Sequence, residues 1–280
     1  MHDKAQHSRF ELKYWISEEQ SLRVRDFVSC HLQLDEFAVG QPTWSYPTLS
    51  LYLDSPGLDL YRDTLNGSMN RYKLRLRYYD DKPRSPVFFE VKRRLNSIII
   101  KRRAGVRKTA VRELLSGQFP LRDYLLDEND EEAFGDLQEF CRLQILNEAR
   151  PTLYVGYMRE AWENPLDNSV RVTMDRSVYS APNRGGELMA HSEQSLPVFG
   201  STVILELKFT NRYPNWFNEL VSRFNCVQTG AAKYAFNIEK HGEDWAQGRV
   251  KEADHVLEQF LAHHEWLRSV EPKPPAKTGP

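Results

Sequence analysis

Polar and apolar residues alternate along several short stretches of this chain, a pattern typical of β-strands with two unlike faces. In the stretch "NRYKLRLRYYD", Arg71, Lys73, Arg75 and Arg77 occupy every second position, with tyrosine or leucine between them. Five other stretches repeat the design: "RFELKYW" from residue 9, "VFFEVKR" from 87, "YVGYMREAW" from 154, "VRVTMDR" from 170 and "VILELKF" from 203. We therefore predict six strands that each carry one charged face.

The polar positions of these strands are unusually uniform, because nearly every one is Arg, Lys or Glu. A solvated outer face is the ordinary interpretation of one such strand, but six strands share the design. Leaving out Arg71 at the edge of its stretch, they carry nine cations (Arg9, Lys13, Lys73, Arg75, Arg77, Lys92, Arg159, Arg171, Lys208) and four acids (Glu11, Glu90, Glu206, Asp175). The excess is five positive charges in a chain whose formal net charge is −1.

Helical periodicity appears between the strands. Residues 16–33 begin with a capping-box pattern, Ser17 followed by Gln20. Residues 111–149 indicate a helical insertion, 213–225 a helix with Pro214 in its first turn, and 253–267 a final amphipathic helix. Such helices can cover the apolar outside of a barrel whose interior is polar. We therefore predict an α+β fold: a closed antiparallel β-barrel with a charged interior, wrapped by α-helices, rather than a sandwich.

Composition bounds the organisation of the chain. Its 280 residues, 40% hydrophobic and 12% aromatic, suffice for one large domain. We expect that domain to span residues 1–245, a C-terminal helix at 246–268 to pack on it, and a disordered tail at 269–280. There is no apolar run long enough to span a membrane and no signal peptide, so we expect a cytoplasmic location. The three cysteines have no metal or redox spacing, which favours reduced packing thiols.

Several familiar nucleotide and hydrolase motifs are absent from the sequence. It contains no Gly-x-x-x-x-Gly-Lys-Ser/Thr loop, no Gly-x-Gly-x-x-Gly after a strand, no His-Glu-x-x-His and no Gly-x-Ser-x-Gly. A bound nucleotide would therefore be held by something other than a P-loop.

A cationic lining points to a polyanionic ligand. Arginine offers bidentate donors that suit phosphate oxygens, and lysine adds a mobile point charge. Mg²⁺ or Mn²⁺ is commonly held by one or two carboxylates together with substrate phosphates. Glu206 and Glu90 are the leading metal ligands on this reasoning. The alternative is that they pair internally with the neighbouring Lys208 and Lys92.

The motifs also occur in a familiar order. The series "RFELKYW", "LYLD", "RYKLRLRYY", "FFEVKRR", "GYMREAW", "VRVTMDR", "VILELKF" and "GAAKYAF" resembles the polyphosphate polymerase (VTC) domain of the vacuolar transporter chaperone complex and its bacterial relatives. That family is part of the triphosphate tunnel metalloenzymes, the CYTH-like superfamily. The resemblance covers about residues 7–240. It implies a tunnel in which basic residues hold a phosphate chain and Mn²⁺ or Mg²⁺ bridges phosphate oxygens.

The resemblance assigns roles to individual residues. As catalytic, chain-clamping residues it implies Lys13, Arg75, Arg77, Lys92, Arg159 and Arg171. Further phosphate contacts are expected from Arg9, Lys73, Lys101, Arg103, Lys208 and Lys233, and metal binding from Glu206, Glu90 and Glu11. In two places the chain departs from the pattern. Arg9 replaces the first glutamate of the superfamily's Glu-x-Glu-x-Lys, and "TGAAKY" lacks a lysine found shortly before the final Lys-Tyr in eukaryotic members.

The expected function is transfer of the γ-phosphoryl group of ATP to a polyphosphate chain. The expected partners are a nucleoside triphosphate and polyphosphate. A triphosphate hydrolase on the same barrel and a non-catalytic polyphosphate-binding module remain as alternatives. Nucleic acid is not expected, because Tyr72 and Tyr78 lie opposite the cations of their strand rather than beside them.

Overall fold

A computed structural model of the chain describes residues 10–96, 98–167, 169–192, 195–210, 212–230 and 232–247. The predicted phosphate contact Arg9, the predicted C-terminal helix beyond residue 247 and the predicted tail lie outside these residues. Within them, no helix is both long and apolar enough to cross a lipid bilayer.

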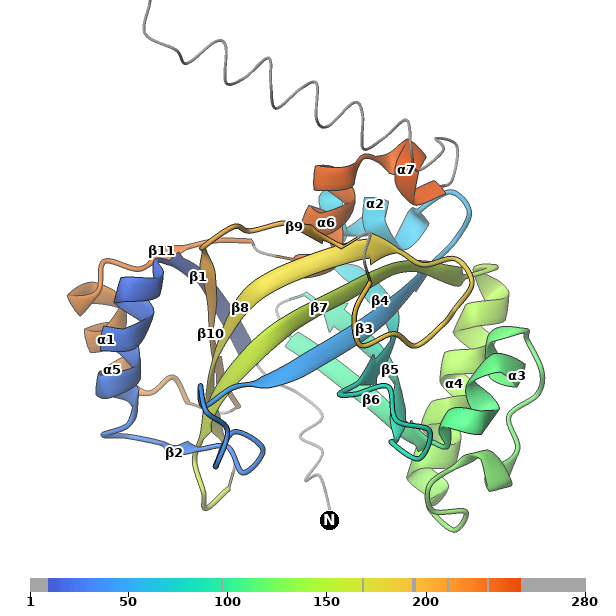
Figure 1. Cartoon of the computed structure of the whole chain (residues 1–280), viewed down its shortest axis with the longest axis horizontal. Helices are drawn as coiled ribbons and strands as arrows, with labels where there is room; N and C mark the ends of the chain where they lie inside the picture. The colour runs from blue at the N-terminus through green and yellow to red at the C-terminus, as the bar shows by residue number, and fades with distance from the viewer. Residues whose placement is uncertain are drawn as a thin grey trace, which may run out of the picture.

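The described strands form one large, strongly curved antiparallel sheet (Figure 1). Its hydrogen-bonded order is β11-β1-β10-β8-β7-β3-β4-β5-β6, with β2 beside β7 and β9 beside β8. The bounds are β1 Phe10–Ile16, β2 Gln33–Leu34, β3 Tyr46–Asp54, β4 Asn70–Tyr78, β5 Val87–Leu95, β6 Ile98–Val106, β7 Arg150–Glu163, β8 Val170–Pro182, β9 Leu196–Pro197, β10 Val203–Phe209 and β11 Val227–Gln228.

The predicted closed barrel is wrong. In the described part of the chain the backbone pairing ends at β11 on one side and β6 on the other, so the sheet is open. Its two ends nevertheless come within reach of each other, because Lys92 on β5 pairs with Glu11 on β1 at 2.9 Å. Side chains, rather than a backbone ladder, bridge the opening.

The strand register places charged residues next to each other across the sheet. All six predicted strands are present, and residues two apart share a face. Lys13 lies opposite Glu206, Arg75 opposite Glu90, and Arg159 opposite Asp175. The register therefore sets opposite charges side by side at these three places on the concave face, whereas Lys73 lies opposite Lys92.

Three groups of helices cover the apolar face and the edges (Figure 1). Helix α1 (Glu18–Val28) and α5 (Asn215–Arg223) pack at the β1 and β10 side, around Val24 and Phe217. Helix α3 (Val111–Leu115) and α4 (Glu131–Leu146) pack at the β5 and β6 side. The third group is α2 (Asp59–Leu65), α6 (Lys233–His241) and α7 (Glu243–Gln247).

The helix predictions that fall on the described residues are confirmed apart from one cap. Ser17 and Gln20 form the predicted capping box at the start of α1. The helical insertion is confirmed by α3 and α4. Pro214 is the N-cap of α5 and not part of its first turn; a residue without an N–H fits there because that group has no partner inside the helix.

Candidate anion-binding cavity

The concave face of the sheet encloses a cavity of about 1560 Å³. Among the described residues, fourteen Lys and Arg and eight Asp and Glu side chains line it. Every predicted site residue that lies in the described part of the chain is among them: Lys13, Lys73, Arg75, Arg77, Lys92, Lys101, Arg103, Arg159, Arg171, Lys208, Lys233, Glu11, Glu90 and Glu206. Residues from seven strands and one helix thus meet in a single cavity.

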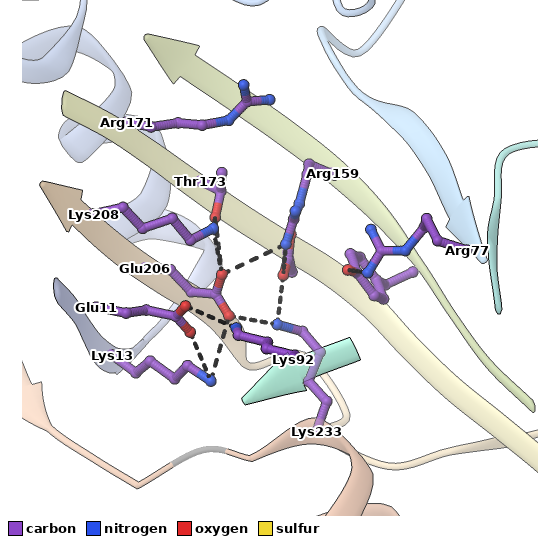
Figure 2. A network of polar contacts seen from close by, with 12 residues as sticks. Glu11, Lys13, Arg77, Lys92, Arg159, Arg171, Thr173, Glu206, Lys208 and Lys233 are labelled. Atoms are coloured by element: carbon purple, nitrogen blue, oxygen red, sulfur yellow. Dashed lines mark hydrogen bonds and ion pairs between the residues drawn. The ribbon is translucent and has the colours of Figure 1, made fainter. Parts of the chain in front are cut away.

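Glu206 lies at the centre of one charge cluster (Figure 2). Its carboxylate is 2.7 Å from Lys208 Nζ and 2.8 Å from Lys233 Nζ, with Arg159 at 3.5 Å and Lys13 at 3.7 Å. Burial alone raises the pKa of Glu206, but the four cations outweigh burial and hold this pKa well below its usual range. Glu206 is therefore a permanent anion shared by four cations.

Asp175 supports the same cluster from β8. Arg159 binds it with two parallel hydrogen bonds of 2.7 and 2.8 Å, and Lys233 Nζ lies 2.6 Å away. Its side chain is fully buried. The sequence placed Asp175 on a charged face but gave it no role in the site. Its position fixes both Arg159 and Lys233, because bidentate pairing restricts the guanidinium plane.

Glu90 and Glu11 organise two further clusters. Glu90 pairs with Arg75 at 2.6 Å and with Arg103 at 3.4 Å. Glu11 pairs with Lys13 at 3.0 Å and with Lys92 at 2.9 Å. Internal pairing, the alternative given for Glu206 and Glu90, therefore holds for both, but Glu90 pairs with Arg75 and not with Lys92. Glu11 is paired in the same way.

Arg171 points away from the Glu206 cluster (Figure 2). Its guanidinium contacts the carboxylates of Asp35 and Glu163 and lies 3.5 Å from the Tyr46 hydroxyl. Asp35 was missed by the sequence analysis. It lies in a loop, where no strand periodicity marks a residue as facing inward.

Arg77 and Lys73 differ from the other cations of the cavity. Among the described residues neither has a carboxylate within ion-pair distance. Arg77 is 5% exposed and donates one hydrogen bond of 3.1 Å to the Tyr157 hydroxyl, while its Nε has no partner in the described part of the chain. The hydroxyl of Ser50, which faces Arg77 in the strand register, is also buried and without a partner there. Arg77 lies close enough to Glu90 to help lower the pKa of that carboxyl, but it makes no direct ion pair among the described residues. A buried cation without a direct ion pair favours an external anion at this point.

Three tyrosines extend the cationic lining. The ring of Tyr52 stacks on that of Tyr234 with centroids 4.7 Å apart, and Arg75 donates to the Tyr52 hydroxyl at 3.3 Å. Tyr157 lies beneath the guanidinium of Arg159 at 5.1 Å. Tyr52 and Tyr234 belong to the motifs "LYLD" and "GAAKYAF", which the sequence analysis identified. A contact between these two motifs was not predicted.

The carboxylates of the cavity do not form a ready metal centre. In the described residues, no group of three His, Cys, Asp or Glu side chains is arranged to hold a metal ion. Glu206, Glu90 and Glu11 are each already paired with lysine or arginine. A divalent ion would fit only where phosphate oxygens supply most of its ligands, as is usual for Mg²⁺.

The family model of the VTC domain matches residues 8–240. The chain belongs to the VTC domain family. Its match to the Schizosaccharomyces pombe vacuolar transporter chaperone complex subunit 2 is 26% identical and covers 62% of this chain. The matched region is 26% of the length of that relative, so the chain spans about a quarter of it.

Two solved structures resemble this VTC-domain chain in outline. One is a putative adenylate cyclase from Bacillus halodurans, with a TM-score of 0.47 and 12% identity, covering 81% of this chain and 95% of the other. The second is a protein from Pyrococcus horikoshii OT3, with a TM-score of 0.44 and 11% identity, covering 83% of this chain and 99% of the other. At these scores neither likeness bears on function.

Proposed function

We propose that the cavity binds polyphosphate and nucleoside triphosphates, and that it transfers the γ-phosphoryl group of ATP to the end of a polyphosphate chain. The observation that carries the proposal is the excess of cations in one enclosed space, fourteen against eight acids among the described residues. An empty cavity with this lining repels itself, and a linear polyanion relieves the repulsion. Membership of the VTC domain family supports the same ligand class.

The chemistry requires positioning and charge stabilisation more than a protein nucleophile. A terminal oxygen of the polyphosphate attacks the γ-phosphorus of ATP, the bond to the β–γ bridging oxygen breaks, and ADP leaves. Arg75, Arg159 and Arg171 are held in place by carboxylates, so they are pre-organised to clamp the equatorial oxygens. Lys13, Lys92 and Lys233 add charge at the walls. Arg77 makes no ion pair with a described carboxylate and donates only to the Tyr157 hydroxyl, so its guanidinium is available to pair directly with phosphate.

A bound Mn²⁺ or Mg²⁺ would add charge neutralisation at the phosphates. Glu206 is the carboxylate that the resemblance to the family assigns to such an ion, with Glu90 and Glu11 as further candidates. Because lysines and an arginine already surround Glu206, this chain would contribute one carboxylate to such an ion, and phosphate oxygens would have to supply the remaining ligands.

A non-catalytic polyphosphate-binding module is the second candidate. The observation that favours it is the pairing of every predicted metal ligand with a lysine or arginine. In that case the same cavity holds the anion and ATP remains intact.

The proposal is tested by incubating the purified protein with ATP and Mn²⁺ or Mg²⁺, with and without a short polyphosphate primer. Products are resolved by gel while free phosphate is assayed. We expect lengthening chains, and a loss of about 100-fold in rate for Arg77→Met, by analogy with single donors to a developing oxyanion. Arg77 is the preferred variant because its removal leaves no described carboxylate without its partner.

Lys82→Met is the control for loss of a positive charge, since Lys82 is exposed and does not line the cavity among the described residues. Free phosphate without longer chains would indicate a hydrolase. Intact ATP together with bound tripolyphosphate would indicate the binding module. Failure to bind either ATP or tripolyphosphate would reject the cavity as a phosphate site.

A further inference from the structure

One tyrosine hydroxyl of the cavity lies beside an arginine that is firmly held. Tyr52 is on β3, lines the cavity and faces Arg75 across the strands. The carboxylate of Glu90 lies 2.7 Å from Nε and 2.6 Å from Nη2 of Arg75. The remaining nitrogen, Nη1, donates to the Tyr52 hydroxyl at 3.3 Å. A phosphate that binds Arg75 at Nη1 is therefore brought next to the phenolic oxygen.

The hydrogen of this hydroxyl has no acceptor among the described residues. The one hydrogen bond that the Tyr52 hydroxyl makes there is the bond it accepts from Arg75. Three other buried tyrosines donate to a protein oxygen: Tyr78, Tyr154 and Tyr234. A buried hydroxyl usually has such a partner. The hydrogen of Tyr52 is therefore available to a ligand in the cavity.

The surrounding cations make the phenol of Tyr52 more acidic. Burial by itself raises the pKa of Tyr52, but Arg75, Arg77 and Lys233 outweigh burial and bring this pKa below the ordinary tyrosine value. At Tyr78, which is also buried, burial dominates and raises the pKa. Tyrosine can act as a nucleophile, and a lowered pKa activates such a group. Tyr52 thus has both the position and the charged surroundings of a phosphoryl acceptor.

We propose that the hydroxyl of Tyr52 accepts the γ-phosphoryl group of ATP, and that the resulting phosphotyrosine starts a polyphosphate chain when no primer is present. This inference rests on the proposed function and adds a first acceptor to it. The phenolic oxygen bonds to the γ-phosphorus, the bond from that phosphorus to the β–γ bridging oxygen breaks, and ADP leaves. The phenolic proton passes to solvent, and nothing is oxidised or reduced.

The cavity suits the product of this step. A phosphotyrosine carries about 1.5 to 2 negative charges near neutral pH and three acceptor oxygens, and arginines opposite it stabilise it. Arg75 donates to the Tyr52 hydroxyl, and Arg77 acts on the same phenol through its charge. Each further phosphoryl group would extend the chain along the cationic lining.

Tyr157 is the competing acceptor in the cavity, since its hydroxyl accepts a hydrogen bond of 3.1 Å from Arg77. Two features favour Tyr52. Glu90 fixes the arginine beside it, and its ring stacks on Tyr234 with centroids 4.7 Å apart. Arg77 has no carboxylate partner in the described part of the chain. Attack on phosphorus requires a fixed geometry between the reacting atoms, and Tyr52 provides it.

The test incubates the whole chain with Mn²⁺ or Mg²⁺ and ATP labelled at the γ-phosphorus, without primer. Free nucleotide is removed from the denatured protein, and tandem mass spectrometry of its peptides locates the label. We expect an alkali-stable label at Tyr52. Tyr52→Phe, which keeps the stacked ring, should lose this label. Its chain growth should fall at least about tenfold more without primer than with one, because the lost nucleophile serves the first transfer.

Tyr61→Phe is the matched control, because Tyr61 is only 3% exposed and does not line the cavity among the described residues. It should keep both the label and unprimed chain growth. Binding of tripolyphosphate, measured by calorimetry, checks that both variants are folded. A label at Tyr157 or elsewhere, an equal loss of primed and unprimed growth in Tyr52→Phe, or chain growth by an unlabelled wild-type protein would overturn the inference without contradicting the proposed function. A wild-type protein with neither label nor chain growth would overturn both.

Discussion

At the scale of single residues, the cavity separates paired from unpaired cations. Arg75, Arg159 and Lys233 each contact a carboxylate and keep their charge when no ligand is present. Lys73 has no such contact among the described residues, and it faces Lys92 across the strands. The ion pairs hold the paired side chains in place in the free protein. A cation without an ion pair favours the binding of an anion.

Lys73 provides a pH-dependent prediction. Burial lowers the pKa of Lys73, and its cationic neighbours lower it further, to well below the ordinary lysine value of 10.5; those neighbours are Lys13, Lys92, Arg71 and Arg75. Between the depressed pKa and 10.5 the unfolded chain holds a proton that the folded chain lacks, so this group's contribution to stability rises with pH in that window. A polyanion favours the charged lysine. Binding of tripolyphosphate at about pH 9 should therefore take up a proton.

Calorimetry in two buffers of different ionisation enthalpy measures this uptake. Lys73→Met should reduce the uptake and weaken binding. Lys73→Arg should reduce the uptake but retain most of the affinity, because arginine is charged throughout the range. An uptake in both variants equal to that of the wild-type protein would assign the proton to another group.

At the scale of elements, α6 is positioned by contacts between two sequence motifs. Tyr234 at its start donates a hydrogen bond of 2.7 Å to Asp54 at the end of β3. The same carboxylate accepts the backbone N–H groups of Leu60 and Tyr61 in α2. This joins two helices to one strand end and holds the adjacent Lys233 against Glu206.

Loss of this contact should affect stability and binding together. For Tyr234→Phe we expect about 1.5 to 3 kcal/mol less free energy of unfolding, the usual value of a hydrogen bond to a charged group. Tripolyphosphate affinity should also fall, since Lys233 loses its anchor. Urea unfolding and calorimetry measure the two effects. Tyr213→Phe is the control, because Tyr213 packs its ring on Phe209 and Phe217. If this variant lost as much stability and affinity as Tyr234→Phe, the effect could not be assigned to the hydrogen bond between Tyr234 and Asp54.

The strands show how far the sequence could predict this site. A period of two identifies the charged face of each strand, and the predicted site residues on the described strands all line the cavity. Lys233 lies on α6 and was assigned only by the resemblance to the family. Which acid neutralises which cation depends on register between distant strands, and the sequence therefore paired Glu90 with Lys92 instead of Arg75. Asp35 and Asp54 lie where periodicity ends. The sequence predicted a closed barrel, but closure requires backbone pairing between the outermost strands. These are β6 and the two-residue β11, and they do not pair with each other.

At the scale of the whole molecule, a nearly neutral chain concentrates its positive charge on one concave face. The formal net charge is −1, yet cations outnumber acids in the cavity lining of the described residues. The sheet around this face is open, and the ion pair between Glu11 and Lys92 joins β1 to β5 across the gap. The cations of the lining repel one another, and only side chains bridge the opening. We therefore expect the strands on both sides of this gap to have a lower local stability in the free protein.

Hydrogen exchange tests that consequence. In the free protein the amides of β6, and those of β1 beyond its two-residue pairing with β11, should exchange faster than those of β3 and β7, which are paired along both edges in the sheet interior. Tripolyphosphate should slow exchange at the gap, because it neutralises both walls and stabilises the bound state by mass action. Lys92→Met should speed exchange in β1 and β5 while leaving β3 and β7 unchanged, whereas the exposed Lys82→Met should have no effect. Identical exchange in Lys92→Met and wild type would mean that the curvature of the sheet, rather than the ion pair, holds its ends together.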